Sequence, residues 1–149
     1  MNGAVDYRGL AEGYARAHGE MTADSIEAVI ALCADDVVFH DPFNDTVGKA
    51  ELRHVFADMF KSTDSPRTEV LGLFGGRRRW IIKWRFTAGL PVIGAVDVPG
   101  LTELTLDDNG LVASHVDYWD SGPAIYGRLP VIGSIIRAVR KRLSAKSRA

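Results

Sequence analysis

The chain has 149 residues, of which 46% are hydrophobic and 25% charged, and this predicts one globular domain with a sizeable core. Its single cysteine, Cys33, excludes an internal disulfide and a cysteine-rich zinc site. The net charge of −1 hides a division, because residues 1–120 carry 11 basic and 19 acidic side chains, whereas residues 121–149 carry seven basic and no acidic ones.

The first predicted helix covers residues 6–19. Its apolar residues recur at i, i+3 and i+4, which places Tyr14 on the stripe that faces the core. A buried tyrosine needs a hydrogen-bond partner for its hydroxyl. A second helix is expected to begin at a cap on Asp24, with Glu27 as the capping-box partner, and to run through Cys33.

A β-branched and aromatic run predicts a strand that ends at Asp41 and Pro42. Side chains alternate along a strand, so Asp41 shares a face with Val37 and Phe39. A carboxylate in an apolar wall resists ionising, and it would then accept a proton near neutral pH. The alternative is structural, because Asp before Pro commonly starts a turn. The pattern alone leaves both interpretations open.

The later part of the body changes from a helical period to a period of two. A third helix is predicted at residues 49–60, with Phe56 facing inward, and a loop follows it at residues 62–67. Strands are predicted at residues 68–74, 79–87, 101–106 and 111–119, whereas residues 89–100 receive no firm assignment. This order predicts an α+β fold in which one curved antiparallel sheet wraps around the N-terminal helices.

The last predicted strand carries two polar candidates. His115, Asp117 and Trp119 share one face of it, and Val116 and Tyr118 share the other. One face would line a pocket and the other would meet solvent. Periodicity alone does not decide between them.

The C-terminal segment predicts a basic amphipathic helix that begins near Pro130. Its apolar stripe consists of Ile132, Ile135, Ile136, Val139 and Leu143. Three interpretations stay open: the helix packs on the acidic body, makes peripheral contact with a membrane, or docks a partner. Nucleic acid is disfavoured as a partner, because the acidic body repels phosphates. We therefore divide the chain into a domain at residues 1–121 and an extension at residues 122–149.

Neither a basic-then-apolar leader nor an apolar run of membrane-spanning length is present in the sequence. We therefore expect a cytoplasmic protein.

Two runs of the chain resemble one known superfamily. The first run, residues 30–42, contains Ala-Asp-Asp and ends in Asp41-Pro42. Gly48 and the helix that carries Phe56 follow it. The second run is residues 104–112. Together they resemble the ketosteroid isomerase and SnoaL-like polyketide cyclase branch of the nuclear transport factor 2-like superfamily, over roughly residues 6–120. The resemblance implies a cone-shaped, cystatin-like α+β roll with a pocket at its open end, and a homodimer. The same cone serves isomerases, cyclases, dehydratases, epoxide hydrolases and non-catalytic binders.

The resemblance also implies roles for individual residues. Asp41 falls where the isomerases keep the base that moves a proton between carbons, and Tyr14 falls where they keep the hydroxyl that stabilises the dienolate oxygen. Thr102 lies near the position of their second donor, a protonated carboxylic acid, and is a weaker donor. Asp117 falls where limonene-type epoxide hydrolases and SnoaL-like cyclases keep a catalytic aspartate.

These observations predict an acid–base enzyme that acts on a small hydrophobic carbonyl compound without a cofactor or a metal. Asp41 or Asp117 would abstract a proton α to the carbonyl, and Tyr14 with His115 would hold the enolate oxygen. Either Asp→Asn substitution is expected to lower turnover more than about 100-fold. The predicted substrate-binding residues are Phe39, Phe56, Trp84, Phe86, Thr102 and Trp119. The rival hypothesis is a non-catalytic binder of an apolar ligand, or an interaction module that uses the basic tail.

Overall fold

The structure, a computed structural model, describes residues 3–145. Its helices are α1 (Tyr7–Gly19), α2 (Ile26–Ile30), α3 (Lys49–Ser62), α4 (Ser121–Ala124), the 3-10 helix η1 (Tyr126–Arg128) and α5 (Ile132–Leu143). Its strands are β1 (Cys33–His40), β2 (Asp45–Val47), β3 (Asp64–Gly76), β4 (Arg79–Leu90), β5 (Gly94–Leu106) and β6 (Val112–Tyr118). No helix within these residues is long and apolar enough to cross a membrane.

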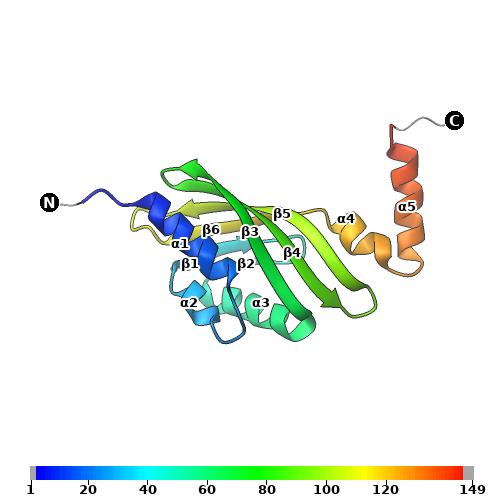
Figure 1. Ribbon diagram of the computed structural model, residues 1–149, viewed down its shortest axis with the longest axis horizontal. Helices are drawn as coiled ribbons and strands as arrows, with labels where there is room; N and C mark the ends of the chain where they lie inside the picture. Colours follow the sequence, from blue (N-terminus) through cyan, green and yellow to red (C-terminus); the bar gives the residue numbers. More distant parts are fainter. Residues whose placement is uncertain (1–2, 146–149) are drawn as a thin grey trace.

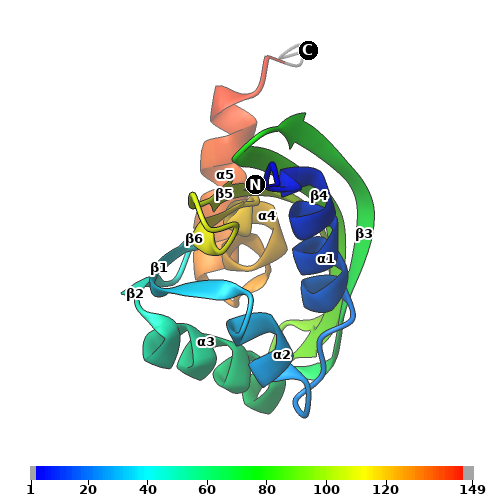
Figure 2. The same ribbon diagram turned by 90° about the vertical axis from the view of Figure 1, so that its left-hand side faces the viewer.

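The strands of the described chain form one curved sheet in the order β2-β1-β6-β5-β4-β3. Neighbouring strands are antiparallel except for β1 and β6, which run parallel. The sheet curls around α1, α2 and α3 without closing into a barrel, as the view along the sheet shows (Figures 1 and 2). This arrangement confirms the predicted α+β fold with N-terminal helices inside a curved sheet.

The second helix is shorter than predicted. It ends at Ile30, and Cys33 opens β1 instead of closing the helix. Pairing decides the boundary, because Cys33 lies opposite Val112 of β6 and the Val112 N–H donates to the Leu32 carbonyl. The predicted cap is also wrong: Ser25 precedes the helix, and no side chain caps it. Cys33 is fully buried.

Two segments without a predicted strand belong to long strands. β3 begins at Asp64, inside the expected loop, and β4 and β5 pair without interruption from Arg79 opposite Thr105 to Leu90 opposite Gly94. Because each strand supplies hydrogen-bond partners to the other along its whole length, the pairing overrides weak local propensity. The Gly-rich residues 89–100 therefore extend the hairpin toward the open end of the cone.

The core lies between the N-terminal helices and the inner faces of β4, β5 and β6. On β4, Trp80, Ile82 and Trp84 alternate along the strand and are buried on its inner face. On β6, His115 is 0% exposed and Tyr118 is 56% exposed, so the face with His115 points inward. This result settles the choice of face that the sequence left open.

The C-terminal segment leaves the body at the open end of the cone. The Arg128 guanidinium of η1 donates to the carbonyls of Ile93 and Ala95 and so fixes this segment to the β4–β5 hairpin. Beyond it, α5 projects away from the sheet and makes its main contacts with η1 (Figure 1). The interpretation that this helix packs over the acidic body is therefore wrong, because the helix turns outward at Val131.

Candidate active site

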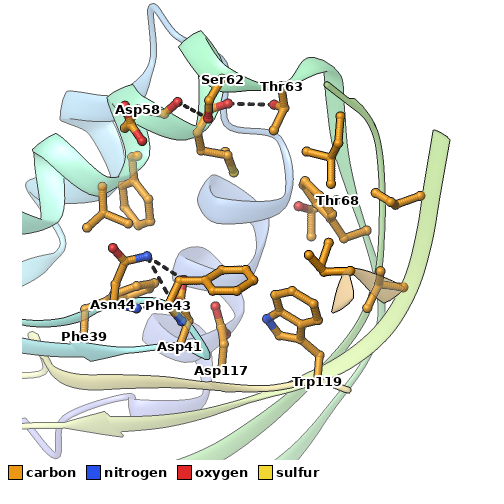
Figure 3. Close-up of a pocket in the computed structure, with 18 of the residues that line it drawn as sticks. Phe39, Asp41, Phe43, Asn44, Asp58, Ser62, Thr63, Thr68, Asp117 and Trp119 are labelled. Carbon is orange, nitrogen blue, oxygen red and sulfur yellow. Dashed lines mark hydrogen bonds between the residues drawn. The ribbon is translucent and has the colours of Figure 1, made fainter. Parts of the chain in front are cut away.

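A cavity of about 370 Å³ lies between α3 and the inner face of the sheet (Figure 3). All five predicted aromatic lining residues contribute to its wall, namely Phe39, Phe56, Trp84, Phe86 and Trp119. Further apolar lining comes from Val55, Met59, Leu90, Val96, Val98 and Ile125. The wall is mostly apolar, and the polar residues that interrupt it are His18, Asp41, Asn44, Asp58, Ser62, Thr63, Thr68 and Asp117.

A chain of hydrogen bonds runs behind and into this wall. The Tyr14 hydroxyl lies 2.8 Å from His115 Nδ1, and His115 Nε2 lies 2.9 Å from Asp117 Oδ1. Thr102 Oγ1 also donates to Asp117 Oδ1, and Trp84 Nε1 donates to Thr102 Oγ1 over 2.8 Å. Five side chains from α1, β4, β5 and β6 are thereby joined, and Asp117 is the acceptor on which they converge.

The sheet register explains how these groups meet. Thr102 lies directly opposite Asp117 on β5 and β6, and His115 lies two residues from Asp117 on the same face. Trp84 lies opposite Gly100, where a Cβ would come within 2.1 Å of the indole ring. The absent side chain at Gly100 lets the indole lean across the strand and reach Thr102.

The donor directions along the chain follow from its acidic end. An ionised Asp117 only accepts, so His115 Nε2 carries a hydrogen and, in the neutral ring, Nδ1 accepts from the Tyr14 hydroxyl. Burial raises the pKa of Tyr14 well above 10, and the nearby Cys33 and Asp117 add to the effect. Tyr14 therefore stays a donor. Within this hydrogen-bonded chain, the buried polar groups of Tyr14, His115, Thr102 and Trp84 all have partners, as buried polar groups generally do.

Asp117 and Trp84 are the two members of this hydrogen-bonded chain that line the cavity, and Asp117 is the ionisable one. Its side chain is 15% exposed, and Oδ1 takes both hydrogen bonds, whereas Oδ2 has no partner among residues 3–145. Burial favours a raised pKa for Asp117, but His115, His18 and the Thr102 hydroxyl together hold the pKa below its ordinary value. The carboxylate is therefore ionised at neutral pH and presents one free oxygen to an apolar space.

His18 is a functional candidate that the sequence reasoning missed. Its ring lines the cavity, 5.0 Å from the His115 ring and 5.6 Å from the Phe56 ring between centroids, with no side-chain hydrogen bond among the described residues. Burial and His115 lower the pKa of His18 to about 4, so the ring is neutral at pH 7. The available signal was its spacing, because His18 follows Tyr14 by four residues on the same helix face.

Asp41 lines the cavity, but its carboxylate is held by its own turn. Oδ1 accepts from the backbone N–H groups of Phe43 and Asn44, both over 2.7 Å, and the Asn44 amide donates to both oxygens (Figure 3). This is the local arrangement in which Asp organises the residues that follow it. The turn interpretation of Asp41-Pro42 is the one that the contacts support.

Other predicted residues lie behind the cavity wall. Tyr14 and His115 are 1% and 0% exposed and do not line the cavity, and Thr102 is 1% exposed. The expected contact of the Tyr14 hydroxyl with a ligand is therefore replaced by its hydrogen bond to His115. Within residues 3–145, no group of three or more His, Cys, Asp or Glu side chains is placed to hold a metal ion.

Comparisons with known proteins agree with this architecture. Residues 12–115 match the model of the SnoaL-like domain family, so the chain belongs to that family. A search of curated proteins gave no match. A similar solved structure is an NTF2-like protein of unknown function from Exiguobacterium sp. 255-15, with 11% identity, a TM-score of 0.64, and coverage of 74% of this chain and 98% of that chain.

Two further similar structures are of enzymes. The Δ5-3-ketosteroid isomerase from Mycobacterium sp. has 19% identity and a TM-score of 0.61, covering 79% of this chain and 95% of that one. The epoxide hydrolase/cyclase-like enzyme SalBIII, which is linked to pyran ring formation in salinomycin, has 16% identity and a TM-score of 0.62, covering 76% and 90%. At these identities the likeness shows a shared fold, and function must be argued from the site.

Thr102→Val is expected to raise the pKa of Asp117. The substitution keeps the volume but removes a hydroxyl that donates to the ionised carboxylate. Carbon-13 NMR of the Asp117 carboxyl would then show a titration midpoint at higher pH than in the wild-type protein. Thr105→Val makes the same chemical change on β5 at a residue that does not bond Asp117. This matched control should leave the titration midpoint of Asp117 unchanged. Equal midpoints in all three proteins would contradict the hydrogen bond.

His18 is expected to make folding stability depend on pH. Its folded pKa of about 4 lies below the ordinary value of 6.5, so the unfolded chain binds the proton first. The contribution of His18 to the free energy of unfolding is complete above a pH of about 6.5 and falls as the pH is lowered toward about 4. Urea unfolding across this window should show the loss in wild type and in His54→Gln, an exposed control on α3. The loss should be reduced in His18→Gln, and an unchanged slope there would refute the assignment.

Proposed function

We propose that the protein is a cofactor-independent acid–base enzyme that abstracts a proton α to the carbonyl of a small hydrophobic ketone. The observation that carries the proposal is the single unpartnered oxygen of Asp117, aimed into an apolar cavity and backed by Thr102 and His115. A carboxylate removed from bulk water but kept ionised is a suitable general base. Asp117 takes this role in preference to Asp41, whose oxygens are occupied by its own turn.

In the proposed reaction, Asp117 Oδ2 accepts the proton from the α carbon, the C–H electron pair forms a double bond to the carbonyl carbon, and the C=O π pair moves to the oxygen. The neutral ring of His18 donates a hydrogen bond to that oxygen as it becomes an enolate. Return of the proton to another carbon of the conjugated system would isomerise the ketone. Attack of the enolate carbon on a second carbonyl of the same molecule would instead close a ring, with the first carbonyl restored and the new alkoxide taking back the proton from Asp117.

The buried residues act through Asp117 without touching the substrate. His115 and Thr102 both bond Oδ1, which fixes the carboxylate plane and leaves Oδ2 for the proton. Tyr14 holds the His115 tautomer that donates to Asp117. The aromatic wall of Phe39, Phe86 and Trp119 excludes water and binds the carbon skeleton.

The choice of a ketone is supported by the family and by the site. The similar structures include one named for a ketosteroid reaction and one named for pyran ring formation in a polyether. In the site, the carboxylate of Asp117, which accepts, and the neutral imidazole of His18 lie near each other in a mostly apolar wall. A ketone offers its α C–H proton to the carboxylate and its carbonyl oxygen to the N–H of the imidazole.

The test uses 2-tetralone, an apolar bicyclic ketone, as a probe. In deuterated buffer the enzyme is expected to catalyse exchange of its α hydrogens, followed by proton NMR, and to show quenching of the fluorescence of Trp84 and Trp119. Saturable quenching without catalysed exchange would replace the proposal by the rival, a non-catalytic binder of apolar ligands. If 2-tetralone causes neither quenching nor exchange, the assignment of a ketone substrate is wrong.

A further inference from the structure

Most of the apolar stripe of α5 is uncovered. Ile132, Ile135, Val139 and Leu143 are between 49% and 81% exposed, although apolar side chains at this spacing normally face a core. The sequence left open whether the body, a membrane or a partner covers this stripe. In the structure, the body does not cover it.

The contact between α5 and η1 fixes the helix without using this stripe. Gly133 approaches the Gly127 carbonyl so closely that a Cβ would lie 2.5 Å from its oxygen, and the Arg137 guanidinium donates to the same oxygen over 2.6 Å. Of the stripe, Ile136 alone turns toward η1 and is partly buried. The helix is therefore held by one side, and its exposed apolar residues point away from that contact.

The charge of the segment complements an anionic surface. Residues 121–149 contain seven basic and no acidic residues, of which Lys146 and Arg148 lie outside the described residues. Arg140, Lys141 and Arg142 stand in the last turn of α5, beside the apolar stripe. The first 120 residues carry a net charge of −8, so the molecule is polarised with its positive end at α5. This polarity would turn α5 toward an anionic surface and the body away from it.

We propose that α5 docks the protein on an anionic lipid surface. Ile132, Ile135, Val139 and Leu143 enter the boundary between headgroups and acyl chains, and the neighbouring cations meet the lipid phosphates, as in interfacial amphipathic helices. A second copy of the chain fits less well. Residues 121–149 contain no acidic side chain, so a second α5 would offer the cations no opposite charge to pair with.

Docking through α5 also orients the cavity. The segment that carries α5 covers the open end of the cone, where Ile125 lines the cavity and the Tyr126 ring lies 6.2 Å from the ring of Phe43. Figure 1 shows α4 and α5 at the same end of the molecule as the tip of the β4–β5 hairpin. The open end would therefore face the lipid surface. The docking itself does not depend on the proposed catalysis.

Co-sedimentation of the full-length chain with vesicles tests the proposal. Wild type is expected to pellet with vesicles of phosphatidylglycerol and phosphatidylcholine, to stay in the supernatant with phosphatidylcholine alone, and to be released by salt. Ile135→Ser combined with Val139→Ser is expected to weaken binding at least about tenfold, since both side chains insert. Arg140→Gln combined with Lys141→Gln is expected to weaken binding about fivefold for each cation removed.

The matched control replaces exposed apolar residues elsewhere. Leu71 and Phe74 of β3 are 51% and 59% exposed, so Leu71→Ser combined with Phe74→Ser makes the same chemical change away from α5. This variant should bind like wild type, and the α5 variants should keep the wild-type exchange of 2-tetralone in solution. Absence of binding to anionic vesicles, or equal losses in both serine pairs, overturns the proposal. A wild-type dimer in sedimentation velocity that the α5 serine pair converts to a monomer overturns it as well, in favour of a second copy.

Discussion

Asp117→Asn is expected to lower the rate of α-hydrogen exchange of 2-tetralone by between about 100-fold and about 10,000-fold, the range for loss of a general base. The amide has the shape of the carboxylate, but it does not accept a proton near neutral pH. The cavity and the hydrogen bond from Thr102 are retained by the variant. Tryptophan quenching by the probe should therefore persist while exchange is lost, which separates binding from chemistry.

Asp41→Asn is the matched comparison, because both aspartates line the same cavity. The sequence alone predicted a loss of more than about 100-fold for this substitution as well. The carboxylate of Asp41, however, accepts four hydrogen bonds from Phe43 and Asn44, so Asp41→Asn should disturb a turn and change exchange less than about tenfold. Sequence analysis left either aspartate as the base, and the contacts of the turn now rank Asp117 above Asp41. The opposite ranking of the two variants would transfer the role of base to Asp41.

His115→Leu is expected to lower the free energy of unfolding by about 3 kcal/mol, because it removes the shared partner of two buried groups. Leucine fills most of the space, but it leaves the Tyr14 hydroxyl without an acceptor and Asp117 without its ring N–H donor. Tyr14→Phe removes one hydroxyl and should cost about 1–2 kcal/mol. Urea unfolding at neutral pH measures both values.

The double variant of Tyr14→Phe with His115→Leu tests whether the two residues act as one unit. Its loss should be smaller than the sum of the single losses by about 1 kcal/mol, because removing either partner already breaks the same hydrogen bond. His54→Leu, an exposed substitution on α3, should be close to neutral and serves as the control for the change in residue type. Strict additivity of the two buried substitutions would show that the bond between them contributes nothing to stability.

The alternation of side chains predicted the walls of the site well. Phe39, Trp84 and Trp119 were placed in the cavity wall from strand periodicity and family resemblance, and they are found there. His115 and Asp117 were placed on one face of the last strand in the same way, and the structure turns that face inward. These predictions succeeded because a period of two fixes which residues share a face whatever lies across from them.

The side-chain contacts between different elements could not be predicted from the sequence. Thr102 donates to Asp117 because β5 and β6 pair in a particular register, and Trp84 reaches Thr102 because Gly100 leaves room across β4 and β5. Such contacts depend on the relative placement of strands, which local periodicity does not contain. His18 was missed for a related reason, since only the packing of α1 against the sheet brings its ring to the cavity.

The most direct test of the account is a crystal structure with bound 2-naphthol, a planar phenol that mimics the enol of 2-tetralone. The rings of 2-naphthol are expected to lie against Phe39 and Trp119, and its hydroxyl oxygen is expected within hydrogen-bond distance of His18, beside Asp117 Oδ2. Binding with the hydroxyl at Asp41, or outside the cavity with Asp117 turned from the ligand, would contradict it.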